Sequence, residues 1–138
     1  MNSSSQVKAL CFRLHRGDDL KTSILSFVQT NKITAGCVAS VVGCLSHLSL
    51  RLADSVSVID KAQPYEIINV SGTITPHHLH LHLSAADSSG HMLGGHMLEG
   101  CVVSYTAEVC ILVFDQFEFD REYDPATGYS ELTVKRTE

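Results

Sequence analysis

Apolar and polar residues alternate along most of this chain, and a two-residue period is typical of β-strands with one buried face. Residues 54–64 are polar and predict a connection between strands. Alternating aromatic and charged residues over 117–134, around a turn at Asp124-Pro125, predict two edge strands. Further strands are expected at residues 7–15, 34–45, 48–52, 65–74, 78–83 and 101–114.

One segment near the N-terminus has a helical period instead. Residues 17–19, Gly-Asp-Asp, offer an N-cap, and Asn31-Lys32 marks the expected end of the helix. One helix among about eight strands predicts an α+β fold with a largely antiparallel sheet. The helix itself is predicted by apolar residues at positions i, i+4, i+7 and i+8, namely Leu20, Ile24, Phe27 and Val28.

Length and composition indicate one folded domain. We expect a single compact domain over residues 1–138, with residues 1–6 disordered and 7–134 forming the core. The net charge of −5 and the scattered basic residues disfavour direct nucleic-acid binding. Five cysteines without a C-x-x-C motif predict reduced thiols. No signal pattern is visible and no apolar run exceeds Val109–Phe114, so we expect an intracellular, cytoplasmic protein, with a nuclear location left open.

Histidines alternate with leucines at residues 78–83, His-Leu-His-Leu-His-Leu. Successive side chains of a strand point to opposite faces, so the leucines enter a core while the imidazoles share the other face. Residues two apart on a strand are roughly 6.5 Å apart, which lets two imidazoles bind one metal ion if a third ligand comes from a neighbouring strand.

The third ligand is predicted from a hairpin that follows this strand. The loop Ser88-Ser89-Gly90 has glycine in the last position, as is common in three-residue hairpin loops. With this loop His96 lies directly opposite His82 and diagonally from His80. A two-residue loop would place His96 on the leucine face, and a bulge at Gly94-Gly95 would also shift the register.

A metal site is one of several explanations for such a strand. The histidines could instead form a solvated face, a pH-sensitive subunit contact, or half-buried rings bonded to backbone carbonyls. Three imidazoles from His80, His82 and His96 around zinc would leave the fourth tetrahedral position open to water or a ligand. Iron, manganese, nickel and cobalt also fit this set of ligands.

Three acidic residues are candidates for proton transfer beside such a metal. Glu108 lies within the apolar strand 101–114, where a carboxylate needs a partner, so it is either a structural ion-paired group or a catalytic one. Glu99 and Asp87 compete for the catalytic role. Arg13 is a candidate for binding a substrate carboxylate, and it could equally pair with Glu108 or Asp18.

Four segments together resemble one known family, the PPC ("plants and prokaryotes conserved") domain. The resemblance covers nearly the whole chain and is most specific in the order H-L-H, S-x-A-D-x-x-G and G-G-H. This order places His80, His82 and His96 in matching positions. The four segments are RLHRGDDL (13–20), YEIINVSGTI (65–74), HLHLSAADSSGHMLGGHM (80–97) and TAEVCILV (106–113).

The resemblance implies a compact α+β domain that assembles as a homotrimer, with a metal on those histidines in some prokaryotic-type members. In plant members the same domain follows AT-hook segments that contact DNA, whereas this sequence contains no Gly-Arg-Pro hook. Four hypotheses remain. The chain is a trimeric, metal-containing binding or assembly module, a metal-dependent hydrolase or lyase acting on a small molecule, a transcription-associated partner of DNA-bound proteins, or a purely structural oligomer without metal.

Overall fold

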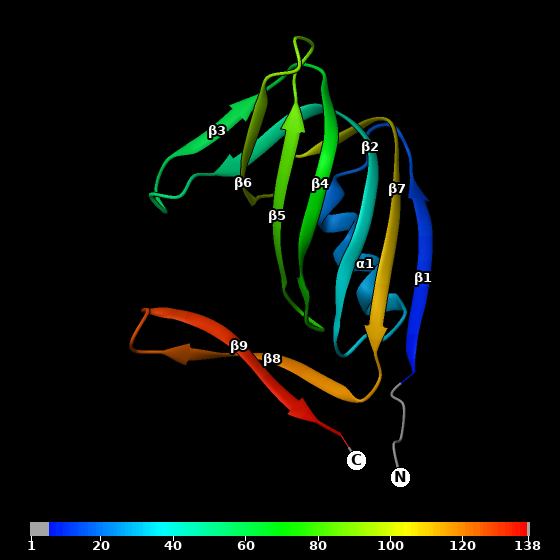
Figure 1. The fold of residues 1–138 in the computed structure, drawn as a ribbon, viewed down its shortest axis with the longest axis vertical. Coiled ribbons are helices and arrows are strands. Elements are labelled where there is room, and N and C mark those ends of the chain that lie inside the picture. The colour runs from blue at the N-terminus through cyan, green and yellow to red at the C-terminus, as the bar shows by residue number, and fades with distance from the viewer. Residues whose placement is uncertain (1–5, 138) are drawn as a thin grey trace.

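Antiparallel strands make up most of the structure, a computed structural model that describes residues 6–137. The expectation of a disordered segment over residues 1–6 falls, apart from Gln6, outside this range. In chain order the elements are β1 (Val7–Leu14), α1 (Leu20–Thr30), β2 (Gly36–Arg51), β3 (Val58–Lys61), β4 (Tyr65–Ile74), β5 (Leu79–Ala86), β6 (Met92–Met97), β7 (Val102–Phe114), β8 (Phe117–Asp124) and β9 (Tyr129–Arg136) (Figure 1).

A seven-stranded sheet forms the body of the molecule. Its strands follow the order β1-β7-β2-β4-β5-β6, with β3 added beside β2, and neighbouring strands are antiparallel. In Figure 1, α1 lies behind the sheet and covers one of its faces. The predicted antiparallel sheet with one N-terminal helix is confirmed, and the molecule is mainly sheet. The core between helix and sheet includes Leu20, Ile24, Val28, Val41, Leu81, Val109 and Ile111.

Residues 34–52 were expected to form two strands, and this expectation is wrong. β2 runs through the region as one strand of 16 residues. Register shifts between residues 38 and 47 let it bend while the ladder continues. Its last four residues pair with β3, and two of them, Leu50 and Arg51, also pair with β6. The polar stretch 54–64 was predicted to be a connection, but it also contains β3, which pairs with the last four residues of β2.

The helix begins and ends where the sequence predicts. The Asp19 side chain accepts hydrogen bonds from the backbone N–H groups of Thr22, at 3.0 Å, and Gly100, at 2.7 Å. At the other end, the backbone and side-chain N–H groups of Asn31 both donate to the carbonyl oxygen of Phe27. With 11 residues, α1 is too short to cross a membrane, and the described chain has no other helix that could.

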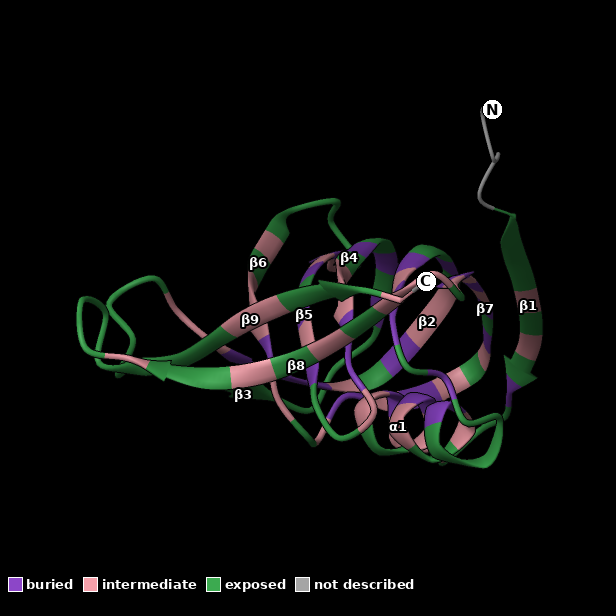
Figure 2. Cartoon of the chain, turned by 90° about the horizontal axis from the view of Figure 1, so that it is seen from below, coloured by how far each residue is buried: buried purple, intermediate pink, exposed green. Residues whose placement is uncertain are grey.

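The two predicted edge strands form a hairpin of their own. β8 and β9 pair only with each other within residues 6–137, around a turn that begins at Asp124. Half-buried Phe117, Phe119 and Arg121 alternate with exposed acidic residues along β8, so the hairpin has two different faces. In Figure 1 the hairpin crosses below the main sheet, and Figure 2 shows that most of its residues are exposed or intermediate.

Candidate metal centre

The hairpin between β5 and β6 has the predicted register. The Gly90 N–H donates to the Asp87 carbonyl oxygen, and the Asp87 N–H donates to the His91 carbonyl oxygen, both at 2.9 Å. Gly90 has a φ of 80°, a left-handed conformation that glycine adopts without strain. From this three-residue loop the ladder runs without a register shift to the pair formed by His82 and His96. The register derived from the loop is therefore confirmed.

Three imidazoles gather on the face of β5 and β6 that lies away from the core. The ring centroids of His80 and His82 are 5.1 Å apart, and those of His96 lie 5.4 and 5.8 Å from them. One nitrogen from each ring lies within 4.8 Å of the other two. Two nitrogens bound to one tetrahedral zinc at about 2.0–2.1 Å are roughly 3.4 Å apart, so small ring rotations would bring all three onto one ion. The donors fit a divalent metal.

A glycine allows the third histidine to reach this position. A Cβ atom on Gly95 would lie 2.6 Å from the carbonyl oxygen of Arg51, which is closer than a side chain tolerates. β6 can therefore approach β2 at this point only because residue 95 has no side chain. The next residue, His96, is paired with Arg51 across the two strands, and paired residues share a face of the sheet. The Arg51 side chain thus lies on the same face as the histidines.

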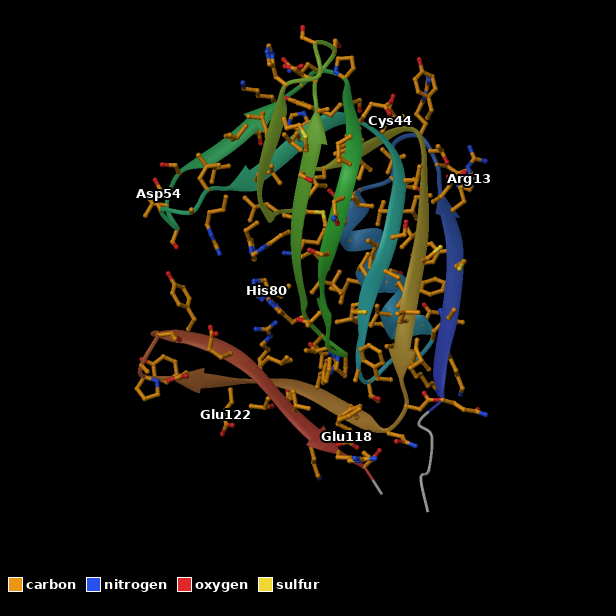
Figure 3. All side chains as sticks on the ribbon, viewed as in Figure 1. Arg13, Cys44, Asp54, His80, Glu118 and Glu122 are labelled. Atoms are coloured by element: carbon orange, nitrogen blue, oxygen red, sulfur yellow. The ribbon has the colours of Figure 1, made fainter. Side chains whose placement is uncertain are left out.

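The three histidines line a cavity of about 350 Å³. None of the described residues that line it is acidic. The acidic residue nearest to this lining in sequence is Asp54, whose Oδ1 accepts hydrogen bonds from the N–H groups of Val56 and Ser57 at 3.0 and 2.8 Å in its own loop (Figure 3). The remaining lining residues come from β2, the loop after it and β6: Arg51, Leu52, Ala53, Ser55, Gly94 and Gly95.

A second guanidinium group approaches the histidines from β8. Nη2 of Arg121 lies 3.5 Å from the hydroxyl oxygen of Thr73, and Thr73 is paired with His80 across β4 and β5. Nε of Arg121 is buried and has no hydrogen-bond partner among the described residues. The acidic residues of the same strand are on its other face, and Figure 3 shows Glu118 and Glu122 pointing away from His80.

Burial and nearby positive charge favour the neutral form of two of the histidines. Burial is the largest cause of the lowered pKa of His80, followed by the charge of Arg121, while the charge of Glu131 acts in the opposite direction. For His96, burial and then the charge of Arg51 lower the pKa to about 4. Metal ions bind neutral imidazole, so neither ring has to lose a proton to bind one at neutral pH.

The three acidic candidates lie outside the cavity. Asp87 Oδ1 accepts hydrogen bonds from the N–H groups of Ser89 and His91, both at 2.9 Å, and these bonds lower its pKa and order the hairpin loop. Glu99 is exposed in the turn after β6. Glu108 is exposed on β7, which β2 and β4 separate from β5 in the sheet. Their catalytic roles stay predictions.

Arg13 also lies far from the histidines. Its Nε donates to the Thr106 hydroxyl oxygen at 2.9 Å, and Figure 3 shows Arg13 and His80 on opposite sides of the molecule. Sequence reasoning missed the two arginines that do lie beside the histidines, Arg51 and Arg121. The alternation of leucine with polar residues over 48–51 places Arg51 on the face of the strand away from Leu48 and Leu50. Nothing in this segment indicates that its end pairs with β6.

Comparison with protein families identifies one match over most of the chain. Residues 1–115 match the model of the Plants and Prokaryotes Conserved (PCC) domain. A curated relative, the bifunctional protein GlmU of Synechococcus sp. strain JA-3-3Ab, is 40% identical over 124 residues, which are 90% of this chain. A second GlmU, from strain JA-2-3B'a(2-13), is 39% identical over 129 residues. The chain spans about 20% of the length of these relatives.

Solved structures share the fold over nearly all residues. A hypothetical protein from Salmonella cholerae-suis superposes with a TM-score of 0.93 at 32% identity, covering 97% of both chains. A protein from Archaeoglobus fulgidus, described as metal-containing, superposes with a TM-score of 0.81 at 23% identity, covering 94% of this chain and 96% of that one. Both matches extend beyond residue 115, so the β8–β9 hairpin belongs to the shared architecture.

Proposed function

The chain belongs to the plants and prokaryotes conserved domain family, and from that premise we propose that it is a homotrimeric binding module carrying one divalent metal ion per subunit. His80, His82 and His96 would hold the ion, and zinc suits three neutral nitrogen donors. The observation that carries the proposal is the convergence of these three imidazoles from β5 and β6. When bound, the ion would supply a Lewis acid with an open coordination position.

A relative of the same fold supports the metal part of the proposal. The Archaeoglobus fulgidus protein is described as metal-containing, which agrees with a metal on this scaffold. The absence of acidic residues from the described cavity lining favours binding over hydrolysis, because a hydrolase needs a group that moves a proton at the metal-bound water. The hydrolase hypothesis has no comparable observation in its favour. Two proteins of the same fold, from Bacteroides thetaiotaomicron and Ralstonia eutropha, carry a DNA-binding description, but the net charge of −5 and the scattered basic residues of this chain disfavour direct contact with DNA.

An uncovered sheet face supports the assembly part. α1 covers one face of the sheet, and the opposite face carries exposed apolar side chains on three strands. Val7 is 53% exposed, Val42 57% and Ile68 52%. Val42 and Ile68 lie close together on adjacent strands, β2 and β4, whereas Val7 lies at the other end of β1. Apolar patches of this kind are typical of subunit interfaces, and a closed three-fold assembly would bury three copies.

Metal content tests the proposal directly. Untagged protein, purified without chelators, should contain about one ion per chain by elemental mass spectrometry. His80→Ala, His82→Ala and His96→Ala should each lose the ion and keep the far-ultraviolet circular dichroism of the wild type, because the three side chains lie outside the core.

Two other histidines of the same segment serve as matched controls. His77 and His91 are exposed and are not part of the cluster, so His77→Ala and His91→Ala should keep the ion. Wild-type protein without metal would overturn the proposal. Equal metal content in all five variants would assign the ion to other residues.

A further inference from the structure

Two arginines flank the histidine cluster, and neither has an acidic partner. Arg51 is paired with His96 at the end of β2, and Arg121 reaches Thr73 beside His80. Among the described residues, no carboxylate oxygen lies within 4.0 Å of either guanidinium group. The site therefore has a positive charge on two sides, one from β2 and one from β8.

One N–H group of this arrangement has no acceptor among the described residues. Nε of Arg121 is buried without a hydrogen-bond acceptor, and leaving a buried donor unsatisfied destabilises a protein. A divalent ion on the histidines would add two further positive charges a few ångströms away. The charge of Glu131 opposes that of Arg121 at His80, but Glu131 is not among the described residues that line the cavity, and none of those residues is acidic. The two arginines together with the ion therefore favour an anion in the cavity.

Resting on the proposed metal site, we infer that the histidine site binds a small-molecule oxyanion, a carboxylate or a phosphate. Arg51, which lines the cavity, and Arg121, which lies outside that lining beside Thr73 and His80, would recognise the anion next to the metal. A guanidinium group presents its N–H donors in a planar fork that matches both kinds of anion. The volume of about 350 Å³ is at the low end for small-molecule sites, which favours a compact ligand over a macromolecule. An oxygen of the anion would take the position that three histidines leave open on the metal.

Cobalt-substituted protein allows anion binding to be measured without any enzymatic assay. Inorganic phosphate and acetate are titrated separately into this protein at constant ionic strength, and the visible absorption of cobalt is recorded. At least one of the two should change the spectrum saturably, and the one that does so identifies the class of anion. Arg51→Gln and Arg121→Gln should each raise the apparent Kd about tenfold or more, because each removes charged hydrogen bonds.

Arg16→Gln is the matched control, because Arg16 donates to the Ser104 carbonyl oxygen and lies over the Tyr105 ring on β7, which β2 and β4 separate from the histidine strand β5. It should take up cobalt and bind the anion as the wild type does. Cobalt uptake without any response to phosphate or acetate, or unchanged affinity in both arginine variants, would overturn the anion inference and leave the metal site standing.

Failure of the metal site gives a different result. If no cobalt is taken up, the proposed function is wrong, and calorimetry of the metal-free protein with the same two anions decides the inference. Binding that Arg51→Gln and Arg121→Gln weaken would support an arginine-based anion site. Absence of binding would overturn it.

Discussion

At the scale of single residues, the fold determines which histidines remain neutral. A histidine of the unfolded chain has a pKa near 6.5. In the folded protein, burial and Arg51 lower the pKa of His96 to about 4, and burial and Arg121 lower that of His80. As the pH falls from 6.5 towards 4, the unfolded chain binds protons that the metal-free folded protein does not. The free energy of unfolding therefore decreases over this range.

We predict that His96→Gln makes the metal-free protein lose less stability between pH 6.5 and pH 4 than the wild type loses. Urea unfolding of chelator-treated protein at several pH values measures this difference. Carboxyl groups such as Asp87, whose pKa is also lowered, titrate at low pH in both proteins, so only the difference is informative. His77→Gln, at an exposed position between β4 and β5 that forms no ion pair among the described residues, should follow the wild type. Parallel curves for wild type and His96→Gln would contradict the prediction.

At the scale of elements, the sequence predicted the features that depend on neighbouring residues and missed one that depends on distant strands. The β5–β6 hairpin was predicted together with its register, because a three-residue loop ending in Gly90 fixes which residues face each other. α1 was predicted because its cap at Asp19 and its apolar spacing are contained in the segment itself. The sequence predicted two strands where the structure has the single strand β2, because the small residues over 34–45 do not indicate that the ladder continues through register shifts.

The close contact of β6 with β2 makes a prediction about Gly95. Gly95→Ala should destabilise the protein by about 1–3 kcal/mol, because its Cβ would overlap the Arg51 carbonyl oxygen and force β6 away. Metal affinity should fall as well, since His96 moves with the strand. In Gly94→Ala the new Cβ would lie 3.4 Å from the Leu83 carbonyl oxygen, an ordinary contact. Thermal melting and zinc titration of both variants measure the effect, and equal melting temperatures would show that the contact does not matter.

At the scale of the whole molecule, the uncovered sheet face predicts how subunits associate. Native mass spectrometry should show an assembly of three 15.0 kDa chains. Val42→Glu should dissociate it while circular dichroism stays that of a folded chain, because the substitution places a charge on the exposed apolar face. Val56→Glu introduces the same charge at an 81% exposed position in the loop after β2 and should leave the trimer intact. A monomeric wild type, or a trimeric Val42→Glu protein, would refute the assembly proposal.

The sequence by itself determined the antiparallel sheet with its single helix, the register of the histidine hairpin and the grouping of His80, His82 and His96. These features depend on side-chain periodicity and turn conformation, which act over a few residues. Only the tertiary structure placed Arg51 beside His96 and Arg121 beside Thr73, and it placed Glu108 and Arg13 away from the histidines. The pairing of distant strands and the packing of a terminal hairpin depend on contacts between residues far apart in the chain, so no local pattern of residues predicts them.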